Sequence, residues 1–470
     1  MKLDWKYIKE SIWYHQRTDA LPCFVFSPVY GVMKLLKSKG VVICHFGKGF
    51  LENFFTEEFF YNEASKVIKC HRLNPGLFKR QYQNWLKKAD ILEKMAERKT
   101  TKDFKYLTNK ELIKNYQDID KTFLRVWSMP IFLDIFDTNL PEFIDKALTK
   151  SIKPTDSEMA ILTSPKQLLK LQEYKLALGK TLKNKMTSQQ VIKKFNFLHY
   201  GYFGGKELDE KILFKDLNNY KKDKKWLKEY LEFNNYKTRI KKQKEKIIKK
   251  YKLSPEIVNF LELVSILVVW RDQRKSFTQK IIRAIDILGK EIAQRSDINW
   301  SELCLCHPFR IDSIPVKKII LNKYAELNKD NYLFYFDGSR FVIVKGKKYD
   351  RLLSYITAQK QENKLKGQIA CPGNITGRVK IIHGVWDFKN FQTGDILVTS
   401  MTRPEFMPII HKAKAIITDE GGITCHAAII SRELNIPCII GTKIATKILK
   451  SGDLVEINDQ EKIVKIIKRK

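Results

Sequence analysis

Hydrophobic and polar positions follow two different periods along this chain. Between residues 80 and 295, apolar residues recur every three or four positions, as in Asn84–Arg98 and Thr108–Val126, which predicts amphipathic helices. Ser254 begins the longest such run, which continues towards Arg295. After Gly367, short β-branched runs alternate with glycines, which predicts a sheet. We therefore expect an α+β, multidomain chain: a mostly helical N-terminal region followed by a compact α/β domain.

A polar segment separates these two regions. Residues 348–366 have a helical pattern but contain TAQKQENKLK, which is almost free of apolar residues. The predicted organisation is a mainly helical region at 1–345 that binds an acceptor or a partner, a helical connector at 346–366, and an α/β domain at 367–470. Strand patterns at Val41–Phe46 and at 332–344, around Asp337-Gly338-Ser339, predict small β elements in the first region. A glycine-containing break at 199–206 interrupts the helical pattern of 187–252.

The last region carries six strand-like runs. They lie at Val379–Ile382, Asp395–Thr399, Ala415–Thr418, Pro437–Gly441, Asp453–Ile457 and Ile463–Ile467, with a predicted helix at Thr424–Leu434. This order is typical of a small domain in which helices cover a sheet.

Composition places the chain among folded proteins of two or three domains, with 470 residues, 44% hydrophobic and 12% aromatic. The N-terminus lacks the apolar core of a signal peptide. The longest apolar stretch, Ile257–Trp270, is interrupted by Asn259 and Glu262 and is shorter than the roughly 20 residues that span a bilayer. We expect a cytoplasmic protein without a membrane partner.

The formal net charge of +35 first suggests a nucleic-acid partner. Residues 367–470 contribute only +5, and the remaining +30 is mostly lysine in helical stretches that also carry Glu and Asp. This distribution favours lysine-rich helix surfaces over a dedicated nucleic-acid face, so no nucleic-acid partner is expected. The eight cysteines show no zinc-type spacing, and no metal site is expected.

Most candidate functional residues lie within 415–434, a segment whose pattern predicts a strand, a tight turn and a helix. Gly421 and Gly422 allow the chain to reverse, Thr424 is the expected N-cap, and Cys425 precedes a histidine in the first helical turn. A helix N-terminus favours an anion, and a neutral imidazole is a nucleophile. His426 is therefore predicted to take up a phosphoryl group as a covalent phosphohistidine. The phosphoryl group would be supported by Thr402, Arg403 and Arg432.

These residues and the motifs around them resemble the mobile, swivelling domain of the PEP-utilising enzymes. That family includes phosphoenolpyruvate synthase, pyruvate phosphate dikinase and rifampicin phosphotransferase. The resemblance starts at Gly367, includes Gly394–Glu405, Thr418–Gly422 and Thr424–Leu434, and ends at Gly452–Val455. It implies that His426 is phosphorylated and that the domain swings between a nucleotide site and an acceptor site.

Full-length relatives also carry an ATP-grasp nucleotide domain, and several carry a barrel that binds phosphoenolpyruvate. Residues 1–366 show neither a glycine-rich phosphate loop nor a long βαβ alternation. The resemblance then implies that ATP or phosphoenolpyruvate, with Mg²⁺, acts as donor on a separate ATP-grasp-type chain. No cofactor is expected on this chain itself.

A further resemblance concerns the acceptor. Residues 197–208 look like a segment of the helical domain of rifampicin phosphotransferase, with Tyr202 where that family has a histidine and with Glu207 after it. The long helix after Ser254, with Arg271 and Arg274, is similar to a later helix of that domain. These four side chains are the candidate site for a small-molecule acceptor, and a plain loop between helices is the alternative for 197–208.

Three functions remain open on the sequence. The first is a phosphotransferase that lacks its own nucleotide domain and carries phosphate on His426. The second is a non-catalytic regulatory or nucleic-acid-binding protein that reuses the phosphohistidine fold. The third is a self-sufficient kinase.

Overall fold

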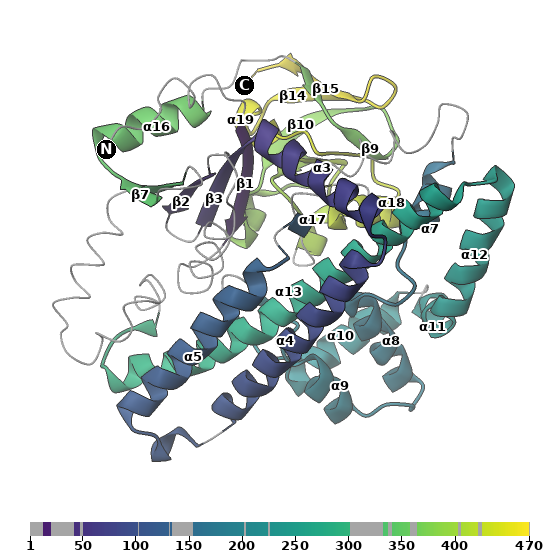
Figure 1. Ribbon diagram of the computed structural model, residues 1–470. Coiled ribbons are helices and arrows are strands. Elements are labelled where there is room, and N and C mark those ends of the chain that lie inside the picture. The colour runs from purple at the N-terminus through teal and green to yellow at the C-terminus, as the bar shows by residue number, and fades with distance from the viewer. Residues whose placement is uncertain are drawn as a thin grey trace.

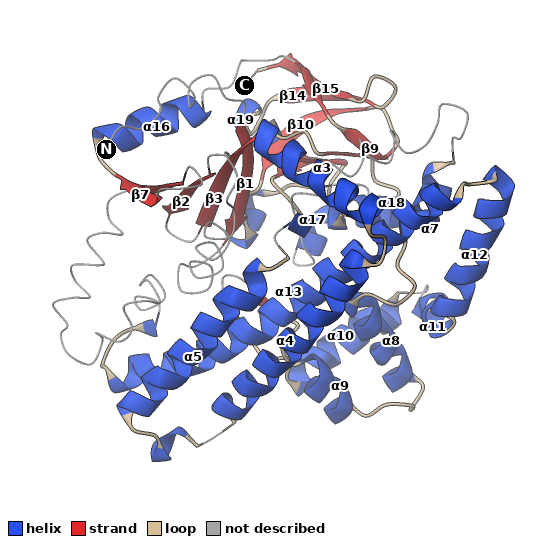
Figure 2. Ribbon diagram, in the orientation of Figure 1, coloured by secondary structure: helices blue, strands red, loops and turns tan. Residues whose placement is uncertain are grey.

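The structure is a computed structural model that describes most of the 470 residues. The described residues are 13–19, 42–47, 50–101, 103–130, 132–133, 154–201, 204–223, 226–300, 332–336, 341–357, 364–402, 406–421 and 425–469. A group of long helices forms one half of the molecule, and two sheets lie in the other half (Figures 1 and 2). The mainly helical region and the α/β domain predicted from the sequence are both confirmed.

The first sheet joins two parts of the chain that are far apart in sequence. Its strands are β1 (Trp13–Asp19), β2 (Val42–Gly47), β3 (Phe50–Thr56), β6 (Tyr332–Phe336) and β7 (Phe341–Val344). Their order is β1-β3-β2-β6-β7, with every neighbouring pair antiparallel. The predicted strand near Val41 and the predicted hairpin are confirmed, while the turn at 337–340 lies outside the described residues. The strands at 13–19, 42–47 and 50–56 therefore share one sheet with the strands at 332–336 and 341–344.

Four helices form the central bundle: α3 (Glu57–Leu73), α4 (Leu77–Thr100), α5 (Asn109–Ser128) and α13 (Pro255–Arg295). Local signals set their ends. The Thr108 hydroxyl accepts a hydrogen bond from the Glu111 N–H, and the Glu111 carboxylate accepts one from the Thr108 N–H, which completes a capping box at the start of α5. The Ser254 hydroxyl caps α13 by accepting a hydrogen bond from the Ile257 N–H, and Pro255 occupies its first turn.

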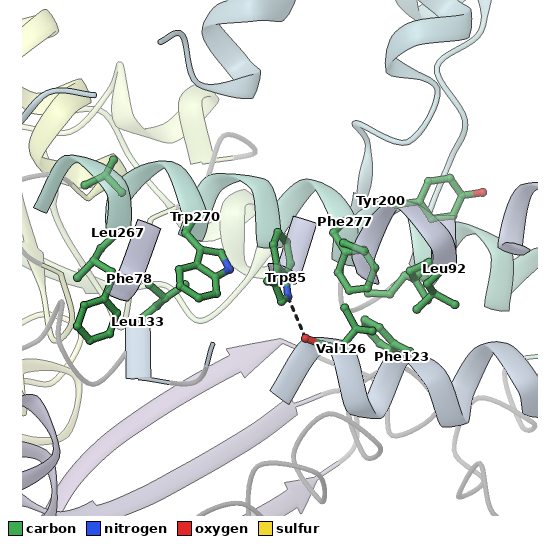
Figure 3. Close-up of a cluster of buried hydrophobic side chains, with 14 of the residues drawn as sticks. Phe78, Trp85, Leu92, Phe123, Val126, Leu133, Tyr200, Leu267, Trp270 and Phe277 are labelled. Atoms are coloured by element: carbon green, nitrogen blue, oxygen red, sulfur yellow. Dashed lines mark hydrogen bonds between the residues drawn. The ribbon is translucent and has the colours of Figure 1, made fainter. Parts of the chain in front are cut away.

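Aromatic side chains fill the core of this bundle (Figure 3). Trp85 of α4 packs between Trp270 and Phe277 of α13, with ring centroids 6.0 Å and 5.6 Å away. Its indole N–H donates to the carbonyl oxygen of Val126 on α5 at 2.9 Å. One buried side chain thus connects three helices and fixes the position of α13.

A second group of helices packs beside α13 around its own small core. It contains α8 (Lys170–Leu182), α9 (Ser188–Phe195), α10 (Glu210–Lys222) and α11 (Trp226–Asn234). Buried apolar residues of α7 (Asp156–Thr163) and α12 (Tyr236–Tyr251), namely Met159, Leu162 and Ile247, instead join the core of the bundle. The predicted glycine break is a two-residue hairpin, β4 (Tyr200–Gly201) and β5 (Gly204–Gly205), which contacts α13.

The C-terminal domain is an eight-stranded mixed sheet in the order β8-β15-β14-β10-β11-β12-β13-β9. Its strands are β8 (Lys364–Lys366), β9 (Gln368–Cys371), β10 (Ile375–Ile381), β11 (Ile396–Thr399), β12 (Ala415–Thr418), β13 (Cys438–Ile440), β14 (Leu454–Asn458) and β15 (Ile463–Lys468). The four central strands, β10 to β13, are parallel, and β11, β12 and β13 are buried along their whole length. The edges of the sheet are antiparallel. Short helices accompany the sheet at α17 (Met407–Ile410), α18 (His426–Leu434) and α19 (Ala445–Ile448).

Two short strands correct the predicted organisation. The connector helix α16 covers only Lys347–Thr357, and Lys364–Lys366 is already strand β8, paired with β15. A single buried residue, Leu365, stands between two exposed lysines there, which is too short a pattern to distinguish a strand from a polar helix. Strand β9 was also missed, because its neighbours in space come from much later in the chain.

Candidate functional site

The site forms where two neighbouring parallel strands end. Strands β11 and β12 run in the same direction, so the loops that follow them leave the same edge of the sheet. The first loop carries Thr402, and the second leads through Gly421 into α18, which begins with His426. The Thr402 hydroxyl oxygen lies 2.9 Å from Nδ1 of His426, although the two residues are well separated in sequence.

In the turn before α18, Gly421 lies in close contact with Cys425. Gly421 has φ +115°, and a Cβ at this position would lie 2.6 Å from the Cys425 sulfur. The Cys425 sulfur accepts a hydrogen bond from the Ala428 N–H at 3.4 Å, so Cys425 is the N-cap of α18. The predicted N-cap at Thr424 was therefore wrong by one residue. Thr424 and Gly422 lie outside the described residues.

The His426 side chain is a neutral nucleophile at physiological pH. Burial lowers its pKa from 6.5 to about 4, and the positive charge of Lys275 on α13 lowers the pKa further in the same direction. When Nδ1–H donates to Thr402, the lone pair of Nε2 is free to attack an electrophile. Thr402 is itself buried, so its hydroxyl is held in place.

Lys275 connects this site to the helical region. It lies on an exposed side of α13, and its charge acts on the ring of His426. The N-terminus of α18 therefore lies close enough to the long helix for the charge of Lys275 to act on the imidazole. The sequence showed Lys275 in the same basic run as Arg271 and Arg274, but only the two arginines were named as candidate acceptor residues.

The other predicted residues are placed differently. Arg274 is buried in the bundle, where it donates to the Pro130 carbonyl at 3.3 Å and stacks over Trp127. Arg271 is half-buried on α13. Glu207 accepts from Arg283 Nε at 2.6 Å, beside the glycine hairpin. Tyr202 lies outside the described residues, as does Arg403.

Arg432 lies on a different face of α18 from His426. Its Nε donates to the Ala428 carbonyl at 2.8 Å, and its charge acts on the buried thiols of Cys371 and Cys438. Burial raises the pKa of both thiols. A contact between Arg432 and the phosphoryl group stays a prediction.

Replacing Lys275 tests the contact between the two regions. We expect Lys275→Gln to raise the pKa of His426 above about 4, because a positive neighbour is removed, while burial keeps it below 6.5. The His426 ring resonance followed by NMR from pH 3 to 8 measures this. Lys280→Gln, on the same helix but paired with Glu93, is the control. An unchanged titration in the Lys275 variant would show that Lys275 does not act on this ring.

The same pKa has a consequence for stability. The unfolded chain takes up a proton on His426 near pH 6.5, before the folded chain does. Protonation therefore favours the unfolded state as the pH falls, and stability present at neutral pH is lost between about 6.5 and about 4.

Two further features bear on the class of protein. In the part of the chain that the structure describes, no three His, Cys, Asp or Glu side chains are grouped so that they could hold a metal ion. Among the same residues, the helices are either too short or too polar to cross a membrane.

Comparison with known proteins identifies the C-terminal domain. Residues 391–461 match the family model described as PEP-utilising enzyme, mobile domain. The chain therefore carries the mobile, phosphohistidine domain of PEP-utilising phosphotransferases, with His426 inside the matched segment.

The similar proteins are phosphotransferases. The chain is 51% identical to a probable phosphoenolpyruvate synthase of Archaeoglobus fulgidus over 100 residues, which are 21% of this chain and 13% of the relative. It is 43% identical to the phosphoenolpyruvate synthase of Pyrococcus furiosus over 134 residues, 27% of this chain and 16% of the relative. It is 44% identical to the uncharacterized phosphotransferase YvkC of Bacillus subtilis over 108 residues, 23% and 12%. These matches span less than a fifth of each relative.

A chain of the holo-form aconitase X structure from Thermococcus kodakaraensis aligns over its whole length with 23% of this chain, at 22% identity and a TM-score of 0.19. This likeness is too low to bear on function.

Proposed function

We propose that this chain is a phosphotransferase component that carries a phosphoryl group on Nε2 of His426. The observation that supports this most strongly is the state of the ring: neutral through burial, and held at Nδ1 by Thr402. In the first step Nε2 attacks the donor phosphorus, the N–P bond forms, and the bond to the donor's leaving group breaks. The Nδ1 proton stays on the ring and continues to donate to Thr402.

The positive groups around Nε2 fit the charge that this step brings in. His426 is the first residue of α18, so the phosphoryl group would lie at the positive end of the helix dipole. The positive charge of Lys275 acts on the same ring. A phosphohistidine in this position would therefore be attracted to α13, where the neutral ring is not.

The helical region serves as the acceptor side in this proposal, because the charge of Lys275 on its longest helix acts on His426. The donor side is supplied by another chain of the ATP-grasp type, using ATP or phosphoenolpyruvate with Mg²⁺. Two observations support a separate donor chain. The resemblance implies a nucleotide domain, and the described helices and sheets contain no glycine-rich phosphate loop of the kind that such a domain carries. The α/β domain would swing as a unit between the two sites.

Intact-mass measurement tests the proposal. The purified chain is incubated with ATP or phosphoenolpyruvate, Mg²⁺ and a candidate ATP-grasp chain, and then exposed to acid or base. We expect one phosphoryl group that is labile in acid and stable in base, absent in His426→Gln and retained in His411→Gln, an exposed histidine of the same domain.

Other outcomes would point elsewhere. Incorporation with ATP alone, without any second chain, would show a self-sufficient kinase. No adduct with any donor, together with salt-dependent binding of nucleic acid by His426→Gln, would support the non-catalytic alternative.

A further inference from the structure

Helix α12 carries far more positive charge than its length predicts. It lies at the outer edge of the helical half of the molecule (Figure 1). Between Tyr236 and Tyr251 it contains seven lysines and one arginine against one glutamate, a net charge of +7. The whole chain has +35 over 470 residues, so 16 average residues would carry about +1. A fifth of the net charge therefore lies on one helix.

The inner face of α12 is fixed against the rest of the helical region. Its buried positions recur every three or four residues: Tyr236, Ile240, Lys244 and Ile247. The Tyr236 hydroxyl donates to the Pro165 carbonyl at 3.2 Å, and Lys244 Nζ donates to Ser265 Oγ of α13 at 3.1 Å. These contacts hold α12 in one rotation about its axis, so the opposite face stays in solvent.

Three lysines form a row on this outer face. Lys242, Lys246 and Lys249 follow one another at intervals of four and three residues, which are steps of about 6 Å and about 4.5 Å along the helix. All three side chains are exposed. Within the described part of the chain, none of the three is in an ion pair, a side-chain hydrogen bond or a ring contact. The lysine row therefore presents uncompensated charge to solvent.

The carboxylates beside the lysine row are engaged with other lysines. Glu245, the one acid of α12, lies 4.0 Å from Lys241. Glu158 of α7 pairs with Lys250 at 2.7 Å. Neither carboxylate neutralises the row, so the counter-charge must come from solvent ions or from a bound partner.

The residue types of the outer face distinguish between classes of anionic partner. Its exposed residues are lysines, Thr238 and Glu245. Protein interfaces are enriched in aromatic residues, Met and Arg and depleted of Lys and Glu, which is the reverse of this composition. A helix that binds a membrane surface needs apolar side chains on its lipid face, and the exposed residues of α12 include none. Lysines that act by charge alone suit the phosphates of a nucleic acid.

We propose that the outer face of α12 binds the phosphate backbone of double-stranded nucleic acid, without sequence preference. Reading bases requires side chains such as Arg, Asn or Gln, and binding a single strand requires aromatic side chains on which bases stack. Arg239, the one arginine of α12, is half-buried and lies 3.9 Å from Glu232. The sequence favoured solvated helix surfaces because its charge was counted over residues 1–366 rather than over one helix face.

A second helix provides a matched control. Lys110, Lys114 and Lys121 of α5 are also exposed, and their spacing places them on one face of the helix. Helix α5 carries four basic and three acidic residues, a net charge of +1. Replacing the three lysines by glutamine on either helix removes the same charge from the protein, but only the α12 variant changes the proposed surface.

Fluorescence anisotropy of the full chain with a labelled DNA duplex tests the inference, at salt concentrations from about 50 mM to about 200 mM. We expect the variant Lys242→Gln/Lys246→Gln/Lys249→Gln to bind at least about 10-fold more weakly than the α5 variant at the low end of this range. The slope of log affinity against log salt should become shallower by about 3, one for each lost phosphate contact. A duplex of unrelated sequence should give the same values.

Equal affinity and equal salt slope for the α12 and α5 variants overturn the inference, because the loss would then reflect net charge and not this face. Equal or tighter binding of the single strand also overturns it. So does a wild-type chain that binds vesicles containing phosphatidylserine but not the duplex. Circular dichroism of both variants checks that the substitutions leave the helices folded.

Discussion

Thr402→Val is expected to slow the phosphorylation of His426 by about 10- to 100-fold. The valine keeps the shape of threonine but removes the only oxygen that the structure places on Nδ1 of the ring among the described residues. A buried N–H left without an acceptor costs about 1–3 kcal/mol, and each 1.4 kcal/mol corresponds to a factor of ten. The variant ring can also place its proton on Nε2, which blocks the attacking nitrogen.

The rate of phosphate uptake from phosphoramidate measures this effect, and nitrogen NMR of the product shows which ring nitrogen is modified. Thr402→Ser retains the hydroxyl and serves as the matched control, with a rate close to that of the wild type. If Thr402→Val reacted as fast as Thr402→Ser, the hydrogen bond at 2.9 Å would have no part in preparing the nucleophile.

Trp85→Ala is expected to destabilise the helical region by about 3–5 kcal/mol, the usual cost of truncating a buried tryptophan. Trp85 is 1% exposed, contacts Trp270 and Phe277 of α13, and donates to Val126 of α5. Its loss leaves a cavity where three helices meet. Urea unfolding monitored by circular dichroism measures the change.

Ile91→Ala is the control for this prediction, because Ile91 lies on the same helix α4 and is 65% exposed. Its effect should stay within about 0.5 kcal/mol. Equal midpoints for the two variants would mean that the aromatic cluster does not hold α13 in place, and the position of Lys275 would then need another explanation.

The sequence predicted those features that depend on neighbouring residues. The capping box at Thr108 and Glu111 and the start of α13 after Ser254 are local signals, and both were placed correctly. His426 was found because its turn, helix start and strand are contiguous in the chain. The short strands β8 and β9 gave too few residues for a period to be visible.

Features made by distant segments could not be predicted in this way. Thr402 meets His426 only because β11 and β12 are parallel neighbours, and it was named from a motif without this contact. Lys275 reaches His426 from another region of the chain, so nothing near residue 426 indicates it. The hydrogen bonds from Gln279 to the carbonyls of Leu198 and Tyr200 are likewise a product of tertiary packing.

The first sheet has a consequence for how this protein is made. Its strands β1, β2 and β3 leave the ribosome early, but their partners β6 and β7 are synthesised only after the whole of α13. The edge of β2 that pairs with β6 is therefore without its partner while the bundle is being translated. Nascent chains halted before residue 332 should accordingly need chaperone protection, and a chain released at residue 345 should not.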